Sequence, residues 1–195
     1  MPDYDNDIPD SIAQRNAVFE FFTGQDYTTV SSSPSNMLRY LFAGKSDRHP
    51  IDTKTAAARL GVSQRTVQRW AKGDSKPRPE LLKKLADRTR QTVTTKRGRT
   101  QLAKKAQASL PGDRRTLIIH GVQGLSSDPQ DMGYNRNGNS YIHLSDDEQR
   151  GLLDAWGNGG DQGALGYLEG IYAQPGRYTD SGTWRFHGVD GMMWR

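Results

Sequence analysis

The chain contains no cysteine, which excludes disulfides, thiolate nucleophiles and zinc sites built on cysteine. Apolar residues are also scarce, at 33% of 195, so the core is modest and much of the chain is loop or tail. No run approaches the roughly 18 apolar residues of a membrane span, and the acidic start has no signal-peptide pattern. We therefore expect a cytoplasmic protein without membrane contact, built as one ordinary domain or two small ones.

The positive charge is concentrated in one part of the chain. From Arg59 to Arg115 there are 17 Lys and Arg against 4 Asp and Glu, whereas the remainder carries 10 basic and 18 acidic residues. Such a block is typical of a protein that binds a polyanion. A solvated basic face has the same composition, so charge alone does not decide between the two.

Residues 52–73 have the pattern of a helix-turn-helix. Asp52 can cap a helix over 53–60, Gly61 suits the turn, and Ser63 can cap a second helix that ends near Lys72. The apolar or small residues that would lock the two helices together are Ala57, Val62, Val67 and Trp70. The pattern predicts a DNA-binding domain over 28–91 and a nucleoid-associated protein. The alternative is an amphipathic helical hairpin with an ordinary basic face.

The outward face of the second helix carries side chains that suit DNA. Gln64, Arg65 and Gln68 lie in its N-terminal half, where base edges are read. The remaining residues of the expected DNA-binding set, mostly phosphate contacts, are Thr66, Arg69, Lys72, Lys76, Arg78, Lys96, Arg97, Arg99, Lys104 and Lys105.

The segments around this motif are predicted to be helical or polar. Residues 1–27 read as an acidic tail with a short helix over 12–22, and a helix over 34–43 precedes a polar loop. After the motif, an amphipathic helix reaches about Arg90. Residues 92–115 are either a basic linker or a solvated helix that becomes ordered on DNA.

Residues 116–195 have the pattern of a small α+β domain. Three strands are predicted, over 116–122, 141–144 and 183–189. A helix that begins after Ser145 is expected to end at Gly157, and Asp161 is expected to cap the next one. The fold class is therefore α+β: an N-terminal all-α helix-turn-helix domain, a basic linker or helix, and a small C-terminal α+β domain.

No catalytic constellation is visible in the sequence. Asp146, Asp147 and Glu148 could suggest a metal site, but a capping box that starts at Ser145 explains them better. The four histidines are scattered, at positions 49, 120, 143 and 187; the second and third could face each other on paired strands, although satisfied or exposed histidines fit better. We expect no catalytic residue, no metal and no cofactor, and hence no enzyme.

The order of segments resembles a known family. The run AAARLGVSQRTVQRWAKGDSKPRPELLKKL at 56–85 is preceded by SNMLRYLFAGK and followed by TLIIHG, YIHLSDDEQRGLLDAW and GALGYLEGIYAQP. With these segments the chain is similar, from about Tyr27 to Arg195, to the telomere-associated terminal proteins of actinobacterial linear chromosomes and plasmids. The reader segment by itself would also fit many repressors, so the combination with the C-terminal segments carries the resemblance.

The resemblance implies a protein that caps the 5′ ends of linear replicons and primes telomere synthesis. A side-chain hydroxyl would attack the α-phosphate of the first nucleotide, a DNA polymerase would supply the metal ions, and a separate telomere-binding protein would recruit the chain to duplex or folded single-stranded ends. The family attaches through a threonine between the first two C-terminal strands, and here the loop GLSSDPQDMGYNRNGNS has none. Ser127, Ser126 and Tyr134 are the candidate attachment residues; otherwise priming has been lost.

Two other functions remain open at this stage. The first is a helix-turn-helix transcriptional regulator whose C-terminal domain serves either dimerisation, which would make the protein a homodimer, or effector binding. The second is a nuclease or relaxase, which would need clustered acids or histidines, or a tyrosine beside a metal site. Tyr134 has no such neighbours in the sequence.

Overall fold

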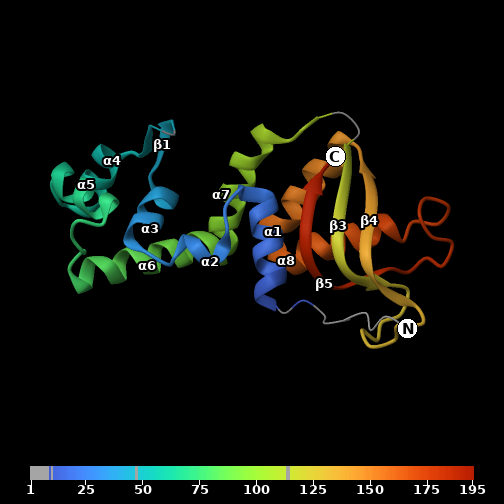
Figure 1. Cartoon of the computed structure of the whole chain (residues 1–195). Coiled ribbons are helices and arrows are strands. Elements are labelled where there is room, and N and C mark those ends of the chain that lie inside the picture. The colour runs from blue at the N-terminus through green and yellow to red at the C-terminus, as the bar shows by residue number, and fades with distance from the viewer. Residues whose placement is uncertain (1–8, 10, 47, 113–114) are drawn as a thin grey trace. The chain divides into compact units, whose positions relative to one another are not determined.

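The computed structural model describes residues 9, 11–46, 48–112 and 115–195, which form two compact units (Figure 1). One unit spans 26–95, and the other joins the segment before residue 26 to residues 96–195. The first is mainly helical and the second contains a three-stranded sheet, so the predicted α+β class is confirmed. Among the described helices, none has both the length and the hydrophobicity that crossing a bilayer requires.

The unit at 26–95 consists of five helices and a hairpin. Its elements are α2 (Tyr27–Val30), α3 (Pro34–Leu41), β1 (Ala43–Ser46), β2 (His49–Ile51), α4 (Thr53–Leu60), α5 (Gln64–Lys72) and α6 (Pro79–Thr94). One apolar cluster joins α3 to α6: Leu38, Val67 and Leu85 have no exposed surface, and Trp70 is buried among them. The helix predicted to reach about Arg90 extends four residues further.

The hairpin is a departure from the sequence prediction. The helix expected over 34–43 ends at Leu41, and the expected polar loop is the antiparallel pair β1–β2. The two strands approach so closely at Gly44 that a Cβ there would lie 1.7 Å from the carbonyl oxygen of His49. The amide of Asp52 donates to the oxygen of Phe42 at 2.7 Å and closes the base of the hairpin. The strands are too short for apolar alternation to reveal them.

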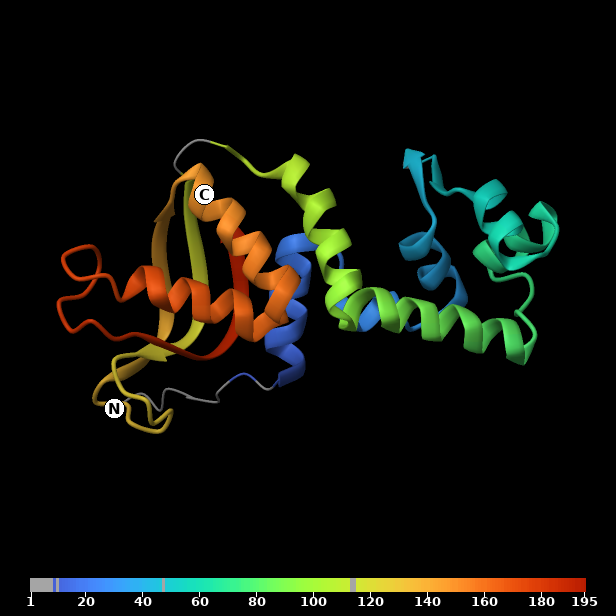
Figure 2. The same ribbon diagram turned by 180° about the vertical axis from the view of Figure 1, so that it is seen from behind.

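The second unit is an antiparallel sheet with helices on one side (Figures 1 and 2). Its elements are α1 (Ser11–Thr23), α7 (Lys96–Ala106), a 3₁₀ turn (Gln107–Ser109), β3 (Arg115–Gly124), β4 (Asn135–Leu144), α8 (Asp146–Tyr172) and β5 (Arg185–Trp194). The strand order is β4-β3-β5. Leu117, Ile119 and Ile142 have no exposed surface, whereas the alternate residues Tyr141 and Met193 are exposed. The sheet therefore has one packed face and one open face.

The short helix expected over 12–22 is confirmed as α1 (Ser11–Thr23), but this helix packs into the fold and is not part of a weakly ordered tail. Phe22 stacks on Trp156 of α8 with ring centroids 4.5 Å apart, and Phe21 lies 5.2 Å from Trp194 of β5. Arg15 pairs with Asp161 at 3.5 Å. The apolar residues of this helix are thus part of the C-terminal core. The acidic residues that suggested a tail lie outside the described part of the chain.

Of the two alternatives for 92–115, the structure has a helix over Lys96–Ala106, and this helix, α7, packs on α8. Gly98 and Ala103 of α7 are buried. Gly157 of α8 lies under this helix, where an added Cβ would meet the Cα of Thr100 at 3.3 Å. This close approach explains why Gly157 does not end a helix as predicted. The break comes at Gly160, whose φ of 66° kinks α8.

The start of α8 is stabilised by the predicted capping box and by Arg177, whose contact with it could not be predicted from neighbouring residues. The hydroxyl of Ser145 accepts from the amide of Glu148, and the Glu148 carboxylate accepts from the amide of Ser145, which confirms the capping box. Arg177, in the loop after α8, donates to Glu148 at 2.5 Å and to the oxygen of His143 at 2.6 Å. The hydrogen bond from Arg177, and after it those from Ser145, lower the pKa of Glu148 to about 2.

This ion pair predicts an acid-dependent loss of stability. Because the folded state lowers the pKa of Glu148, its stabilisation is complete above the ordinary value of 4.5 and is lost as the pH falls toward 2. We expect Glu148→Gln, which keeps the capping geometry, to lower the free energy of unfolding at pH 7 by about 1–2 kcal/mol, and to differ little from the original protein near pH 2. Urea unfolding followed by tryptophan fluorescence measures this, since Trp156, Trp184 and Trp194 all lie in this unit.

The control is Asp147→Asn, which removes a carboxylate from the same helical turn. The Asp147 side chain is 92% exposed and pairs only with Arg150 among the described residues, so we expect its unfolding free energy to stay within about 0.5 kcal/mol of the original at pH 7. Equal losses in both variants would show that general helix-terminal charge, rather than the bond to Arg177, is responsible.

Candidate DNA interface

Local sequence signals fix the ends of α4 and α5. The carboxylate of Asp52 accepts from the amide of Thr55 at 3.0 Å, and this bond lowers the pKa of Asp52. Ser63 accepts from the amide of Thr66 at 3.1 Å. Gly61 and Gly73 end the two helices with φ of 69° and 81°, a region that glycine enters without strain. The helix limits predicted at 53–60 and from Ser63 to Lys72 are therefore confirmed.

Apolar packing fixes which face of α5 points outward. Val67 is fully buried and Trp70 is 4% exposed, and both pack with Ala57 and Leu60 of α4. Residues three and four positions apart share a helix face, so burying this pair turns the remaining positions toward solvent. Arg65, Gln68, Arg69 and Lys72 are indeed exposed. None of the three cations forms an ion pair with a described residue.

Two residues of the expected DNA-binding set at the start of α5, the reader Gln64 and Thr66, already have partners. Gln64 donates through Nε2 to the hydroxyl of Thr53 at 2.9 Å, which leaves its amide oxygen as an acceptor for a base amino group. Thr66 is half-buried, and its hydroxyl lies 2.8 Å from that of Ser63. Gln64 is thus held in one orientation across the turn, whereas Thr66 serves the cap of α5.

The cations after α5 fall into two groups. Lys76 and Arg78 are exposed in the loop between α5 and α6, and Arg78 precedes α6 without forming a side-chain cap. The other group, Lys96, Arg97, Arg99, Lys104 and Lys105, lies on α7 and so belongs to the unit with the sheet. These five side chains are therefore not part of the helix-turn-helix unit.

Arg99, one of the expected DNA contacts, lies against α8 in the structure. Its guanidinium covers Gly160, where an added Cβ would lie 3.3 Å from Cζ, and its charge acts on Asp161. Burial raises the pKa of Asp161, and Arg15 and Arg99 oppose this shift. Arg99 therefore supports the kink of α8. Lys96, Arg97, Lys104 and Lys105 are exposed.

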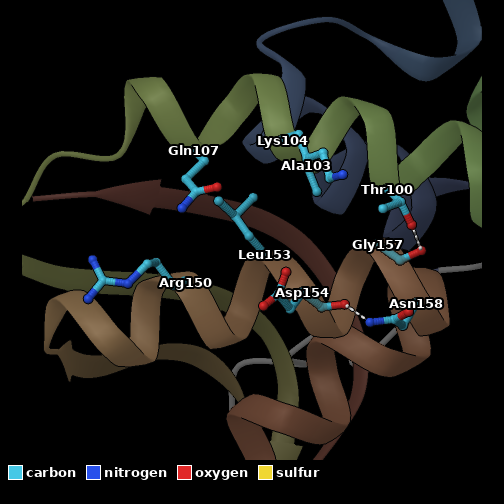
Figure 3. Close-up of a pocket in the computed structure, with 9 residues that line it drawn as sticks. All are labelled: Thr100, Ala103, Lys104, Gln107, Arg150, Leu153, Asp154, Gly157 and Asn158. Atoms are coloured by element: carbon cyan, nitrogen blue, oxygen red, sulfur yellow. Dashed lines mark hydrogen bonds between the residues drawn. The ribbon is translucent and has the colours of Figure 1, made fainter.

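Lys104 lies at a small hollow of about 100 Å³ between α7 and α8 (Figure 3). Thr100 donates to the carbonyl oxygen of Gly157 at 3.4 Å across this seam, and Asn158 donates to the oxygen of Asp154. The hollow is only a few water molecules in size and is lined by side chains of both signs. It is a helix–helix seam rather than a binding site.

The candidate attachment residues lie in the loop between β3 and β4. Ser127 is exposed, and its hydroxyl forms no hydrogen bond with a described residue. Tyr134 is 66% exposed. Ser126 is half-buried, and its hydroxyl accepts from the amide of Asp128 at 3.2 Å. Ser140, at the end of the predicted loop, is a buried residue of β4 and presents no hydroxyl to solvent.

Asn135 gives this loop its shape. Its side chain accepts from the amide of Ser126 at 3.2 Å and donates to the oxygen of Asp128 at 2.6 Å. His187 of β5 adds a bond through Nε2 to the oxygen of Ser126 at 2.9 Å. The loop base is thus fixed, while Ser127 and Tyr134 project from it.

Among the described residues, the histidines and acids form no group of three or more that could hold a metal ion. The less favoured alternative, that His120 and His143 face each other, is wrong, because the register pairs them with Asn139 and Thr116 respectively. His120 Nδ1 instead lies 2.5 Å from Asp190 on β5. The strand β4 begins at Asn135, six residues earlier than predicted.

Sequence reasoning missed a basic groove beside α5. It is formed by α3, the β1–β2 hairpin and α5, and includes Arg39, Arg48 and His49 together with Gln68 and Lys72. The segment that supplies Arg48 and His49 has the composition of a polar loop. The only signal in the sequence was the basic pair Lys45 and Arg48 on either side of a turn, which is weak.

Comparisons with known proteins agree with this geometry over one part of the chain. The helix-turn-helix family model matches residues 53–96, which cover α4, α5 and α6. No curated protein and no solved structure matches the chain significantly. The match and the exposed polar face of α5 together identify a helix-turn-helix DNA-binding domain in the unit at 26–95.

Proposed function

We propose that the chain is a terminal protein that binds DNA through α5 and primes synthesis from a hydroxyl in the β3–β4 loop. The observation that supports this most directly is the exposed hydroxyl pair of Ser127 and Tyr134, on a loop whose base is fixed by Asn135. A protein primer needs such a group, because its hydroxyl must enter the active site of another enzyme. The resemblance of segments across residues 27–195 supports the same function.

The priming step would be a phosphoryl transfer. The hydroxyl oxygen would attack the α-phosphorus of the first deoxynucleoside triphosphate, form an ester bond, and displace pyrophosphate. The hydroxyl proton would pass to a base in the polymerase, and the polymerase would hold the divalent cations. The chain itself would supply only the nucleophile and the DNA-binding domain. Ser127 fits this role best, since Ser126 is tied into its turn by Asp128.

A labelling experiment tests the priming function. The protein is incubated with its polymerase, a telomeric template, Mg²⁺ and an α-³²P nucleotide, and label that survives denaturation is measured. We expect labelling of the original chain and its loss, by at least about 100-fold, in Ser127→Ala, because that change removes the attacking oxygen. Ser126→Ala and Tyr134→Phe are the matched controls and should keep the label.

The outcomes separate the candidate sites. Loss of label only in Tyr134→Phe would transfer the attachment to the tyrosine. No label in any chain, when a known member labels under the same conditions, would reject priming and leave the DNA-binding function intact.

A transcriptional regulator is the second candidate, and the match of the reader segment to the helix-turn-helix family favours it equally. A regulator would bind a short internal duplex with no preference for ends, and the unit with the sheet would serve dimerisation or an effector. Footprinting on a linear replicon distinguishes the two functions. Protection at internal promoters alone would support the regulator.

Both functions require the outward face of α5, and this predicts a mutational effect. We expect Arg65→Ala with Arg69→Ala to weaken duplex binding by about 10–100-fold at 150 mM salt, because each arginine loses a base or phosphate contact. The slope of log K against log salt should become shallower by up to about 1.8, since each lost phosphate contact contributes about 0.9. Fluorescence anisotropy over a salt series measures both quantities.

The matched control is Arg88→Ala with Arg90→Ala, two exposed arginines of α6 in the same unit. This pair removes the same charge from a different helix. An equal loss of affinity in both pairs would mean that net charge, not the face of α5, determines binding.

A further inference from the structure

A groove runs along α5 and is walled by elements that the helix-turn-helix motif itself does not include. The hollow measures about 410 Å³ and is open to solvent. Arg39 of α3, Arg48 and His49 of the β1–β2 hairpin, and Gln68 and Lys72 of α5 line it. Volumes in this range accept a ligand the size of a nucleotide unit. The hairpin therefore adds Arg48 and His49 to the polar surface formed by Gln68 and Lys72 of α5.

Three cationic side chains border the groove, and the described residues that line it with them carry no negative charge. Arg39, Arg48 and Lys72 come from three different elements, all three are exposed, and none forms an ion pair with a described residue. The described residues that line the groove include no aspartate or glutamate. Three cations gathered around one hollow repel each other, so an anion bound among them would be stabilised.

The walls of the groove are held by the fold rather than by a ligand. Ser35 of α3 donates to the carbonyl oxygen of Ala71 of α5 at 2.8 Å, which joins two walls directly. The close approach at Gly44 and the bond from Asp52 to Phe42 fix the hairpin to the end of α3. Arg48 therefore directly precedes a strand, β2, that is held against β1 and the end of α3. A cation beside a fixed strand loses less conformational entropy on binding than one on a free loop.

The groove shares Gln68 and Lys72 with the outward face of α5, so whatever lies in it also lies beside the bases that α5 reads. A nucleic acid backbone is the anion that must run along that flank. Arginine suits this role, because its planar guanidinium can donate two parallel hydrogen bonds to one phosphate. A free nucleotide would also fit the groove. A nucleotide site, however, would not explain why the groove shares Gln68 and Lys72 with the outward face of α5.

We propose that this groove holds the sugar–phosphate backbone of one duplex strand next to the base pairs read by α5, with Arg39 and Arg48 as the phosphate-binding residues and the β1–β2 hairpin as a basic arm. The proposal rests on the DNA binding of the proposed function but not on priming. Contacts to phosphate set register and affinity and carry no base information. The groove should thus determine how tightly the domain binds and not which sequence it prefers.

The test compares duplex binding by the full chain and its Arg39→Ala/Arg48→Ala variant over a salt series. We expect the variant to bind its preferred duplex about 10–50-fold more weakly at 150 mM salt, and its salt slope to be shallower by about 1.8, for two lost phosphates. The ratio of affinities for preferred and scrambled duplexes should change by less than about twofold. Hydroxyl-radical footprinting should lose protection of the flanking backbone, while methylation protection of guanines by α5 remains.

The control is Lys83→Ala with Lys84→Ala, which removes two exposed cations from α6 in the same unit. Circular dichroism confirms that each variant is folded, and Arg39→Lys with Arg48→Lys should restore most of the salt slope. A loss in the α6 pair as large as in the groove pair would overturn the proposal in favour of a net-charge effect. So would a change in sequence preference of tenfold or more, which would make these arginines base readers.

Other outcomes distinguish this inference from the proposed function. If the chain binds duplex and loses binding only in Arg65→Ala/Arg69→Ala, the groove inference is wrong and the role of α5 stands. If the original chain does not bind any duplex, both are wrong. Titration calorimetry with a deoxynucleoside triphosphate and with inorganic phosphate completes the test: binding that depends on Arg39 and Arg48, with duplex affinity unchanged, would show a nucleotide site instead.

Discussion

The packing of α5 against α4 is the constraint on which DNA recognition depends. Val67 and Trp70 have their apolar surface in a core shared with Ala57 and Leu60, and this burial contributes roughly 2–3 kcal/mol for each large side chain. The helix cannot rotate without exposing that surface. Every polar residue on the other side of α5 is therefore presented to solvent at a fixed angle. The same rigidity gives the groove its third wall, because Gln68 and Lys72 lie on α5.

Much of the helix-turn-helix could be predicted because its signals are local. Asp52, Gly61, Ser63 and Gly73 act within three or four residues of their own positions, and the structure confirms each of them. The burial of Val67 and Trp70 follows from helical spacing alone. The capping box at Ser145 was predictable for the same reason. The sequence also indicated all three strands of the sheet, although β4 and β5 differ from the predicted limits.

The features that the sequence did not reveal depend on contacts between distant segments. Nothing near Phe22 shows that it stacks on Trp156, more than a hundred residues away, so α1 resembled part of a tail. Glycine is common at helix ends, so Gly157 was predicted to end a helix. In the structure it lies inside α8, where the missing side chain lets α7 approach closely. Arg99 was counted among DNA contacts because it lies in a basic run, and nothing in the sequence indicated that its guanidinium lies over Gly160. Basic composition alone thus does not show which cations also have contacts within the fold.

The two units also differ in charge, and this restricts how the chain can meet DNA. Residues 26–95 carry 14 Lys and Arg against 6 Asp and Glu, whereas the rest of the chain carries 13 against 16. The loop from Leu125 to Tyr134 contains Asp128 and Asp131 and no basic residue. Net electrostatic attraction to DNA is therefore strongest for the helix-turn-helix unit, and the hydroxyl-bearing loop itself contributes no positive charge to it. A nucleophile in such a loop would reach a nucleotide only when cations neutralise the triphosphate. In the proposed function the polymerase supplies those cations, so priming would require a polymerase. Binding of DNA by the helix-turn-helix unit would not require one.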